Sequence, residues 1–148
     1  DCSGLTHLAT VGRYWLSNCT SLTALCCSGL TQLTTVGDQW LCGCACLASL
    51  DCTGLSDLAT VGDFWLCRCT SLTALRCIGF TKLTAVGDSW LSGCTGLTEL
   101  DCTGLTQLAT LGGCWLRGCT SLASLALDGT KDPQPASKSK RRRRRKAS

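Results

Sequence analysis

The stretch Leu72-Thr73-Ala74-Leu75-Arg76-Cys77 sets the pattern of the whole chain. Its spacing, Leu-x-x-Leu-x-Cys, occurs four times at intervals of 25 residues, and a fifth copy ends in Leu127 in place of cysteine. Side chains that alternate between an inward and an outward face over so few residues predict a short strand. In this strand Leu75 and Cys77 face a core, whereas Arg76 faces outward.

The same period extends in both directions from this stretch and fills residues 1–125. One tryptophan column and two glycine columns follow it: Trp15, Trp40, Trp65, Trp90, Trp115; Gly4, Gly29, Gly54, Gly79, Gly104; Gly12, Gly37, Gly62, Gly87, Gly112. One unit cannot bury its own apolar face, so stacked units share a core and a parallel sheet. We expect five units, at 1–25, 26–50, 51–75, 76–100 and 101–125, with a partial last strand that ends the domain at residue 130.

The rest of each unit predicts what lies opposite the strand. Leu30, Leu33 and Val36 form a second inward run, between glycines that permit turns. The segment from Trp40 to Leu47 carries only a weak helical signal. The predicted fold is therefore an α/β solenoid, with a parallel sheet on a concave face and a mostly irregular or short-helical convex side.

The convex half supports a family resemblance. It reads Val86-Gly87-Asp88-Ser89-Trp90-Leu91-Ser92-Gly93-Cys94-Thr95-Gly96-Leu97. This resembles the treponemal or BspA-like class of leucine-rich repeats, which read roughly I-G-x-x-A-F-x-x-C-x-x-L, although Trp-Leu stands here in place of Ala-Phe and the unit is slightly longer. The resemblance covers residues 1–130 in five copies. It implies a protein-binding scaffold, often at a cell surface, and no catalytic residues.

Ten of the 15 cysteines fall in two further columns: Cys2, Cys27, Cys52, Cys77, Cys102; Cys19, Cys44, Cys69, Cys94, Cys119. The first column is an inward strand position, which Leu127 occupies in the last copy, so we expect packed, reduced thiols. The second column matches the cysteine of the family pattern. Disulfides are the alternative, although an odd number of cysteines cannot all pair within the chain.

Metal binding and catalysis are not expected. Cys42, Cys46 and Cys67 are the candidates for a zinc site, but the sequence has no Cys-x-x-Cys pair and His7 is its only histidine. It also lacks a phosphate-binding glycine loop and a nucleophile elbow. We predict no cofactor, no metal and no enzymatic activity. The tryptophan column is interpreted as a packed ladder, with a platform for stacking nucleic-acid bases as the alternative.

The outward strand positions are the expected partner-binding surface. Most hold small residues, and the larger exceptions are Asp51, Arg76, Ile78, Glu99 and Asp101. The concave sheets of solenoids commonly hold protein partners. The alternative is that Asp51, Arg76 and Asp101 form only a cross-strand charge ladder.

The chain also divides by charge. Residues 126–148 hold nine basic and two acidic residues, a net charge of +7, whereas residues 1–125 hold five basic and eight acidic residues, a net charge of −3. Eight of the nine residues 138–146 are basic: Lys138, Lys140, Arg141, Arg142, Arg143, Arg144, Arg145, Lys146. Such a block repels itself, so we expect 131–148 to be a disordered tail. It is interpreted as a targeting signal read by nuclear import machinery; the alternatives are a non-specific nucleic-acid arm, an anionic-membrane patch and a solubilising end.

Together these features predict a non-enzymatic protein-interaction scaffold with a polybasic targeting tail, in the nucleus or cytoplasm. One alternative is a nucleic-acid-associated protein that binds through the tail, and another is a cell-surface adhesion or antigen module. No apolar stretch is long enough to span a membrane. The sequence contains no methionine, so we expect a fragment or a processed chain.

Overall fold

The computed structural model describes residues 2–127. The predictions for the tail, 131–148, and for the end of the repeat domain, 128–130, lie outside these residues.

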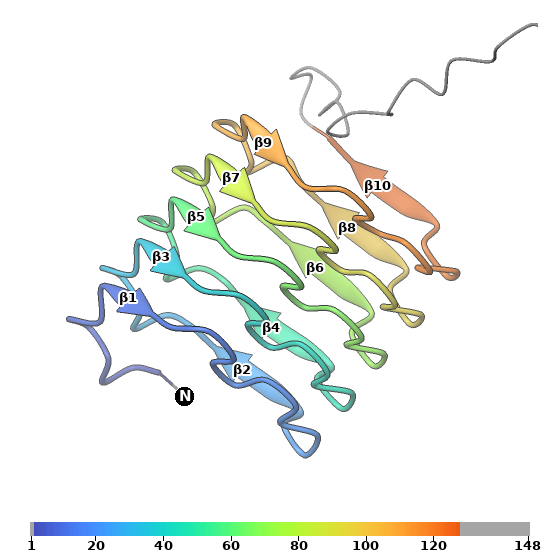
Figure 1. Cartoon of the computed structure of the whole chain (residues 1–148), viewed down its shortest axis with the longest axis horizontal. Helices are drawn as coiled ribbons and strands as arrows, with labels where there is room; N and C mark the ends of the chain where they lie inside the picture. Colours follow the sequence, from blue (N-terminus) through green and yellow to red (C-terminus); the bar gives the residue numbers. More distant parts are fainter. Residues whose placement is uncertain (1, 128–148) are drawn as a thin grey trace, which may run out of the picture.

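Two rows of short strands run along the described chain, and each turn of the coil contributes one strand to each row (Figure 1). One row holds β1 (Thr10–Val11), β3 (Thr35–Val36), β5 (Thr60–Val61), β7 (Ala85–Val86) and β9 (Thr110–Leu111). The other row holds β2 (Ala24–Cys26), β4 (Ser49–Asp51), β6 (Ala74–Arg76), β8 (Glu99–Asp101) and β10 (Ser124–Ala126). The second row contains the strands that the Leu-x-x-Leu-x-Cys pattern predicts.

All strand pairs are parallel, and each residue pairs with the residue 25 positions away, as Leu75 does with Leu100. The chain is therefore a parallel β-solenoid whose turn length equals the sequence period. The row of odd-numbered strands forms one continuous five-stranded sheet. The even-numbered row is divided into a two-stranded sheet, β2-β4, and a three-stranded sheet, β6-β8-β10.

The core lies between the two rows and consists of the columns that the sequence places inside. Cys27, Leu30, Leu33 and Val36 are all buried, as are their equivalents in the next two turns. Among the described residues no polar or charged side chain is fully buried. The inward and outward assignment of the repeat is thus confirmed in the central turns.

The convex side is irregular rather than short-helical: residues 2–127 contain no helix, so the α part of the predicted α/β class is not found there. Its turns place three residues per unit at positive φ, for example Gln39 (62°), Leu41 (56°) and Gly43 (74°). A residue in the left-handed region interrupts a right-handed helix. The backbone groups here bond to neighbouring turns instead; the Gln39 N–H donates to the carbonyl of Asp63 at 2.7 Å. The odd-numbered strands were also not predicted, because each spans only two residues.

Candidate functional site

The even-numbered row is interrupted between β4 and β6. At the other junctions a hydrogen bond closes the start of the strand pair, as when the Thr98 N–H donates to the Thr73 carbonyl at 2.8 Å. Another closes its end, where the Cys77 N–H donates to the Asp101 carbonyl at 2.8 Å. Neither bond has an equivalent between β4 and β6 within the described chain, so the N–H groups of Thr73 and Cys52 lack their ladder partners.

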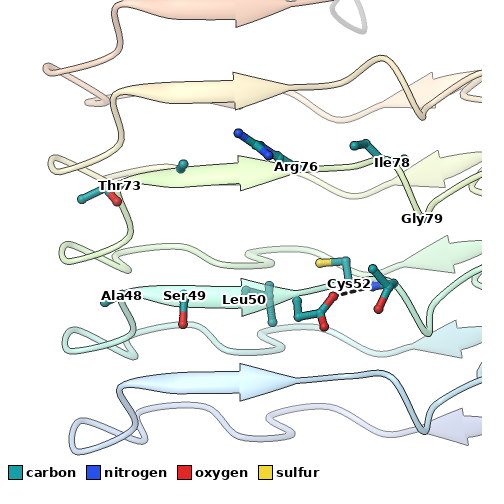
Figure 2. A pocket seen from close by; sticks show the side chains of 11 residues that line it. Ala48, Ser49, Leu50, Cys52, Thr73, Arg76, Ile78 and Gly79 are labelled. Atoms are coloured by element: carbon teal, nitrogen blue, oxygen red, sulfur yellow. Dashed lines mark hydrogen bonds between the residues drawn. The ribbon is translucent and has the colours of Figure 1, made fainter.

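An open groove of about 580 Å³ lies at this interruption. Figure 2 shows it between the two strands, with Ser49 and Leu50 on the β4 side and Arg76 and Ile78 on the β6 side. Unpaired backbone groups at a strand edge can accept hydrogen bonds from, or donate them to, another polypeptide. The groove is therefore the candidate functional site.

The structure brings three of the five predicted partner-binding residues to the groove. Asp51, Arg76 and Ile78 line it, and the Ile78 side chain is 61% exposed. Glu99 and Asp101 lie one strand further on, in β8, where Asp101 is the register partner of Arg76. These two residues border the β6 strand on its other side rather than lining the groove.

The arrangement of charges differs from a regular ladder. Arg76 Nη2 lies 3.9 Å from Glu99 Oε1 in an exposed ion pair, and Figure 2 shows the Arg76 side chain directed away from β4. Such a pair contributes little to stability, because both side chains are solvated. Asp51 faces Cys26 in the register of β2 and β4, and residues 2–127 give it no ion-pair partner. The predicted ladder is thus interrupted where the sheet is interrupted.

Asp51 and Asp101 share a local structure that favours their charged forms. The Asp51 Oδ1 atom accepts the Thr53 N–H at 3.0 Å, and this bond holds the pKa of Asp51 below its usual value. Asp101 accepts the Thr103 hydroxyl at 2.6 Å and its N–H at 3.0 Å, which together lower the pKa of Asp101. Both groups are accordingly carboxylates at neutral pH.

The small polar residues of the groove, Ser49, Thr53 and Thr73, are not among the residues that the sequence singles out for partner binding, although Ser49 and Thr53 belong to the predicted outward surface. Their identities give no signal, since Ser or Thr also stands at outward positions of turns that have no groove, such as Ser28, Thr103 and Ser124.

One departure from the repeat lines the groove: Ile78 stands in a column that is Ser or Thr in the other units of residues 1–125. A second departure, the buried Phe80, follows directly after the lining residue Gly79 and stands in a column that is Leu in those other units.

The tryptophan column is a stacked ladder inside the solenoid. Trp65 lies between Trp40 and Trp90, with ring centroids 5.4 and 5.3 Å away and planes within 4° of parallel. These three side chains are almost completely buried, and their Nε1 atoms have no hydrogen-bond partner. Burial of the rings excludes base stacking on these three tryptophans.

All 15 cysteines lie within residues 2–127, and none forms a disulfide in this structure. The second column donates thiol hydrogen bonds to the preceding turn, as Cys69 Sγ does to the Leu41 carbonyl at 3.1 Å. The first column packs in the core, where burial raises the pKa of Cys27 to about 12. Leu127 is 45% exposed in the last described turn, so it does not test whether a central turn accepts leucine.

The zinc candidates do not converge. Cys42 and Cys67 lie side by side in consecutive turns, but Cys46 is exposed on another part of its turn. Within residues 2–127 no three His, Cys, Asp or Glu side chains gather closely enough to hold a metal ion. His7 is exposed in the first turn. Nor does any helix in the described part of the chain have the length and apolarity needed to span a membrane.

Comparison with known proteins adds one structural similarity. No protein-family model matches the chain, and no curated protein is significantly similar to it. The crystal structure of a leucine-rich-repeat protein from T. pallidum is similar, with a TM-score of 0.36 and 18% sequence identity over 78% of this chain and 72% of that one. The description of the chain as a parallel solenoid rests on its own strand pairs.

Proposed function

We propose that the chain is a non-enzymatic scaffold that binds an extended segment of a protein partner in the groove between β4 and β6. The single observation that carries this proposal is the missing ladder between the two strands. It leaves backbone donors and acceptors beside an exposed apolar side chain, Ile78, and beside Asp51, a carboxylate that has no ion-pair partner within residues 2–127. Extended peptides bind strand edges through main-chain hydrogen bonds and gain specificity from side chains.

The chemistry of the groove suggests the partner's sequence. Asp51 favours a Lys or Arg side chain in the partner, because no cation in residues 2–127 pairs with it. Ile78 favours an apolar residue nearby. Arg76 forms an ion pair with Glu99, so we expect it to contribute less to partner binding than Asp51 or Ile78 does.

A selection from a random peptide display library on the full chain tests this proposal. We expect basic-apolar peptides whose affinity falls at least tenfold with Asp51→Asn and with Ile78→Thr, the latter because Thr53 and Thr103 already occupy that column. Lys82→Glu is the control, since Lys82 pairs with Asp57 at 2.7 Å outside the groove. Equal losses with all three variants, or none with any, would place the binding surface elsewhere.

The basic block 138–146 supports a second proposal, that the tail is a nuclear import address. Its support is the charge of the block, eight basic residues in nine. Deletion of 138–146 from a fusion too large to diffuse into the nucleus should abolish nuclear accumulation. If the deletion variant still accumulates there, the alternative that the tail binds nucleic acid is favoured. Binding of the full chain to nucleic acid should then weaken steeply as the salt concentration rises. Display on the outer cell surface would instead favour the adhesion module.

A further inference from the structure

Cys42 and Cys67 occupy an outward column of the convex turn that is otherwise polar. The other members are Ser17, Ser92 and Arg117. Ser17 and Ser92 each donate a hydroxyl hydrogen bond to the carbonyl of the next turn, at 3.3 Å in both cases. Where two consecutive turns carry cysteine, the Cys42 side chain instead interacts with the thiol of Cys67. These two sulfurs are therefore neighbours across the junction of the second and third turns.

The backbone holds the two residues in register. On one side of them the Leu66 N–H donates to the Trp40 carbonyl at 3.0 Å, and on the other the Gly43 N–H donates to the Cys67 carbonyl at 2.7 Å. Parallel neighbours held in this way are about 4.8 Å apart. A disulfide requires Cα atoms about 4.4–6.8 Å apart. The separation fits a cross-link without rearrangement of the turns.

Exposure and hydrogen bonding together separate this pair from the other cysteines. Cys42 is half-buried, so a small oxidant can reach its sulfur, and Cys67 is 7% exposed directly behind it. Cys19 and Cys119 are also half-buried beside a buried cysteine, but those buried partners, Cys44 and Cys94, donate their thiols to backbone carbonyls. Cys77 and Cys102 also interact, but both are enclosed in the core. The exposed cysteines Cys46 and Cys114 stand in columns of the repeat that hold no other cysteine.

We propose that Cys42 and Cys67 form a reversible disulfide that clamps the second turn to the third. The oxidant is the disulfide of a small thiol, such as oxidised glutathione. The Cys42 thiolate attacks one sulfur of that disulfide and releases the first small thiolate, which takes up a proton. Cys67 then loses its proton and attacks the Cys42 sulfur, releasing the second small thiol. Two protein thiols are oxidised and one small disulfide is reduced to two thiols.

This disulfide would join the second turn to the third, the same two turns whose strands β4 and β6 are not hydrogen-bonded to each other. It would therefore reinforce the junction that has the fewest strand hydrogen bonds. The disulfide should form slowly at neutral pH, because little of the Cys42 thiol is then in the reactive thiolate form. Burial, the proximity of Cys67 and, to a smaller extent, that of Cys44 raise the pKa of Cys42 to about 11, against the opposing effect of Arg68. The rate of oxidation should therefore rise about tenfold per pH unit from 7 to 10, as the thiolate fraction does.

Peptide mapping of the full chain tests the proposal. The protein is treated with oxidised glutathione at pH 8.5, unfolded in an alkylating reagent and digested without reduction. We expect a peptide pair joined through Cys42 and Cys67 that is lost on reduction. Cys67→Ser, which restores the residue found at Ser17 and Ser92, should leave glutathione on Cys42, whereas Cys46→Ser should leave the cross-link unchanged.

Amide exchange gives a second readout. The Gly43 N–H should exchange at least tenfold more slowly after oxidation, because its acceptor is the Cys67 carbonyl. The Gly93 N–H, which donates to the Arg117 carbonyl at 2.7 Å in an equivalent turn, should not change. Persistent glutathione on Cys42 in the native sequence, linkage of Cys42 to Cys46, or a rate independent of pH would overturn the proposal.

Discussion

Gly54 lies against the carbonyl oxygen of Cys27, one turn earlier, so closely that a Cβ atom would overlap it. That Cβ would also lie 2.7 Å from the Cα atom of Ser28. The glycine column is therefore required by the close approach of stacked turns. The sequence pattern suggests a different reason, conformational freedom at a turn, but Gly54 has no positive φ.

Alanine substitutions along this column should give graded losses of stability. Gly54→Ala should reduce the free energy of unfolding by about 1–3 kcal/mol, the usual cost of overpacking. Gly79→Ala should also destabilise but cost less, because its added Cβ would lie 2.5 Å from the Cys52 carbonyl oxygen and no closer than 3.5 Å to the Thr53 Cα atom, a milder overlap than at Gly54. Gly4→Ala is the control, since no atom lies within 4 Å of its Cβ position. Denaturant unfolding measures the order, and equal costs at all three positions would contradict it.

Trp65 is expected to be the most sensitive member of the aromatic ladder. It stacks on a tryptophan at each side and meets Phe80 edge-on at 5.4 Å. Trp65→Ala should reduce the free energy of unfolding by about 3–5 kcal/mol through loss of burial and creation of a cavity. Trp65→Phe should cost less, because it keeps a ring and removes the unpaired Nε1 donor. A phenylalanine variant as unstable as the alanine variant would show that stacking area is not the main contribution.

The Thr103 hydroxyl should control the titration of Asp101. Thr103→Val removes the hydrogen bond that contributes most to the lowered pKa of Asp101, so this pKa should rise toward its usual value. A carboxyl group whose pKa is lower in the folded state stabilises the fold above its unfolded pKa and loses that effect as pH falls through its folded pKa. The variant should therefore lose part of this contribution near neutral pH. NMR titration of the side-chain carboxyl carbon from pH 2 to 6 measures the shift, with Asp51 as the control that should not move.

The repeat determines how much of this structure is predictable from sequence. Strict recurrence fixes which columns face the core, so Leu30, Leu33, Val36 and the central tryptophans are buried as expected. It also fixes the parallel register of 25. Both follow from the requirement that identical units stack on one another.

The convex turns and the groove follow from features that the repeat does not display. Leu41 and its equivalents adopt positive φ, a region that leucine rarely enters, and they are held there because their side chains are buried. Nothing in a leucine column signals such a backbone. The groove depends on a difference between units, and such differences are visible only as the departures at Ile78 and Phe80.

Phe80 is expected to be a cause of the groove. It is completely buried four residues after β6, where it meets Trp65 of the preceding turn, and is larger than the leucine that occupies its column in the other turns, at Leu5, Leu30, Leu55 and Leu105. Phe80→Leu should let β6 approach β4 and restore the ladder bond from the Cys52 N–H. A hydrogen bond contributes about 1 kcal/mol, so exchange of the Cys52 amide should slow about fivefold.

Two controls make the Phe80 prediction specific. The Cys77 N–H is already bonded to the Asp101 carbonyl, so its exchange should be the same in both proteins. The peptides selected on the native chain should bind the variant more weakly, because a closed junction offers them no unpaired backbone groups. If Cys52 exchanges at the native rate in a folded Phe80→Leu protein, the bulk of the phenylalanine does not open the sheet. The cause would then lie in the loop before β6, where the Ser71 N–H donates to the Ala45 carbonyl at 3.1 Å.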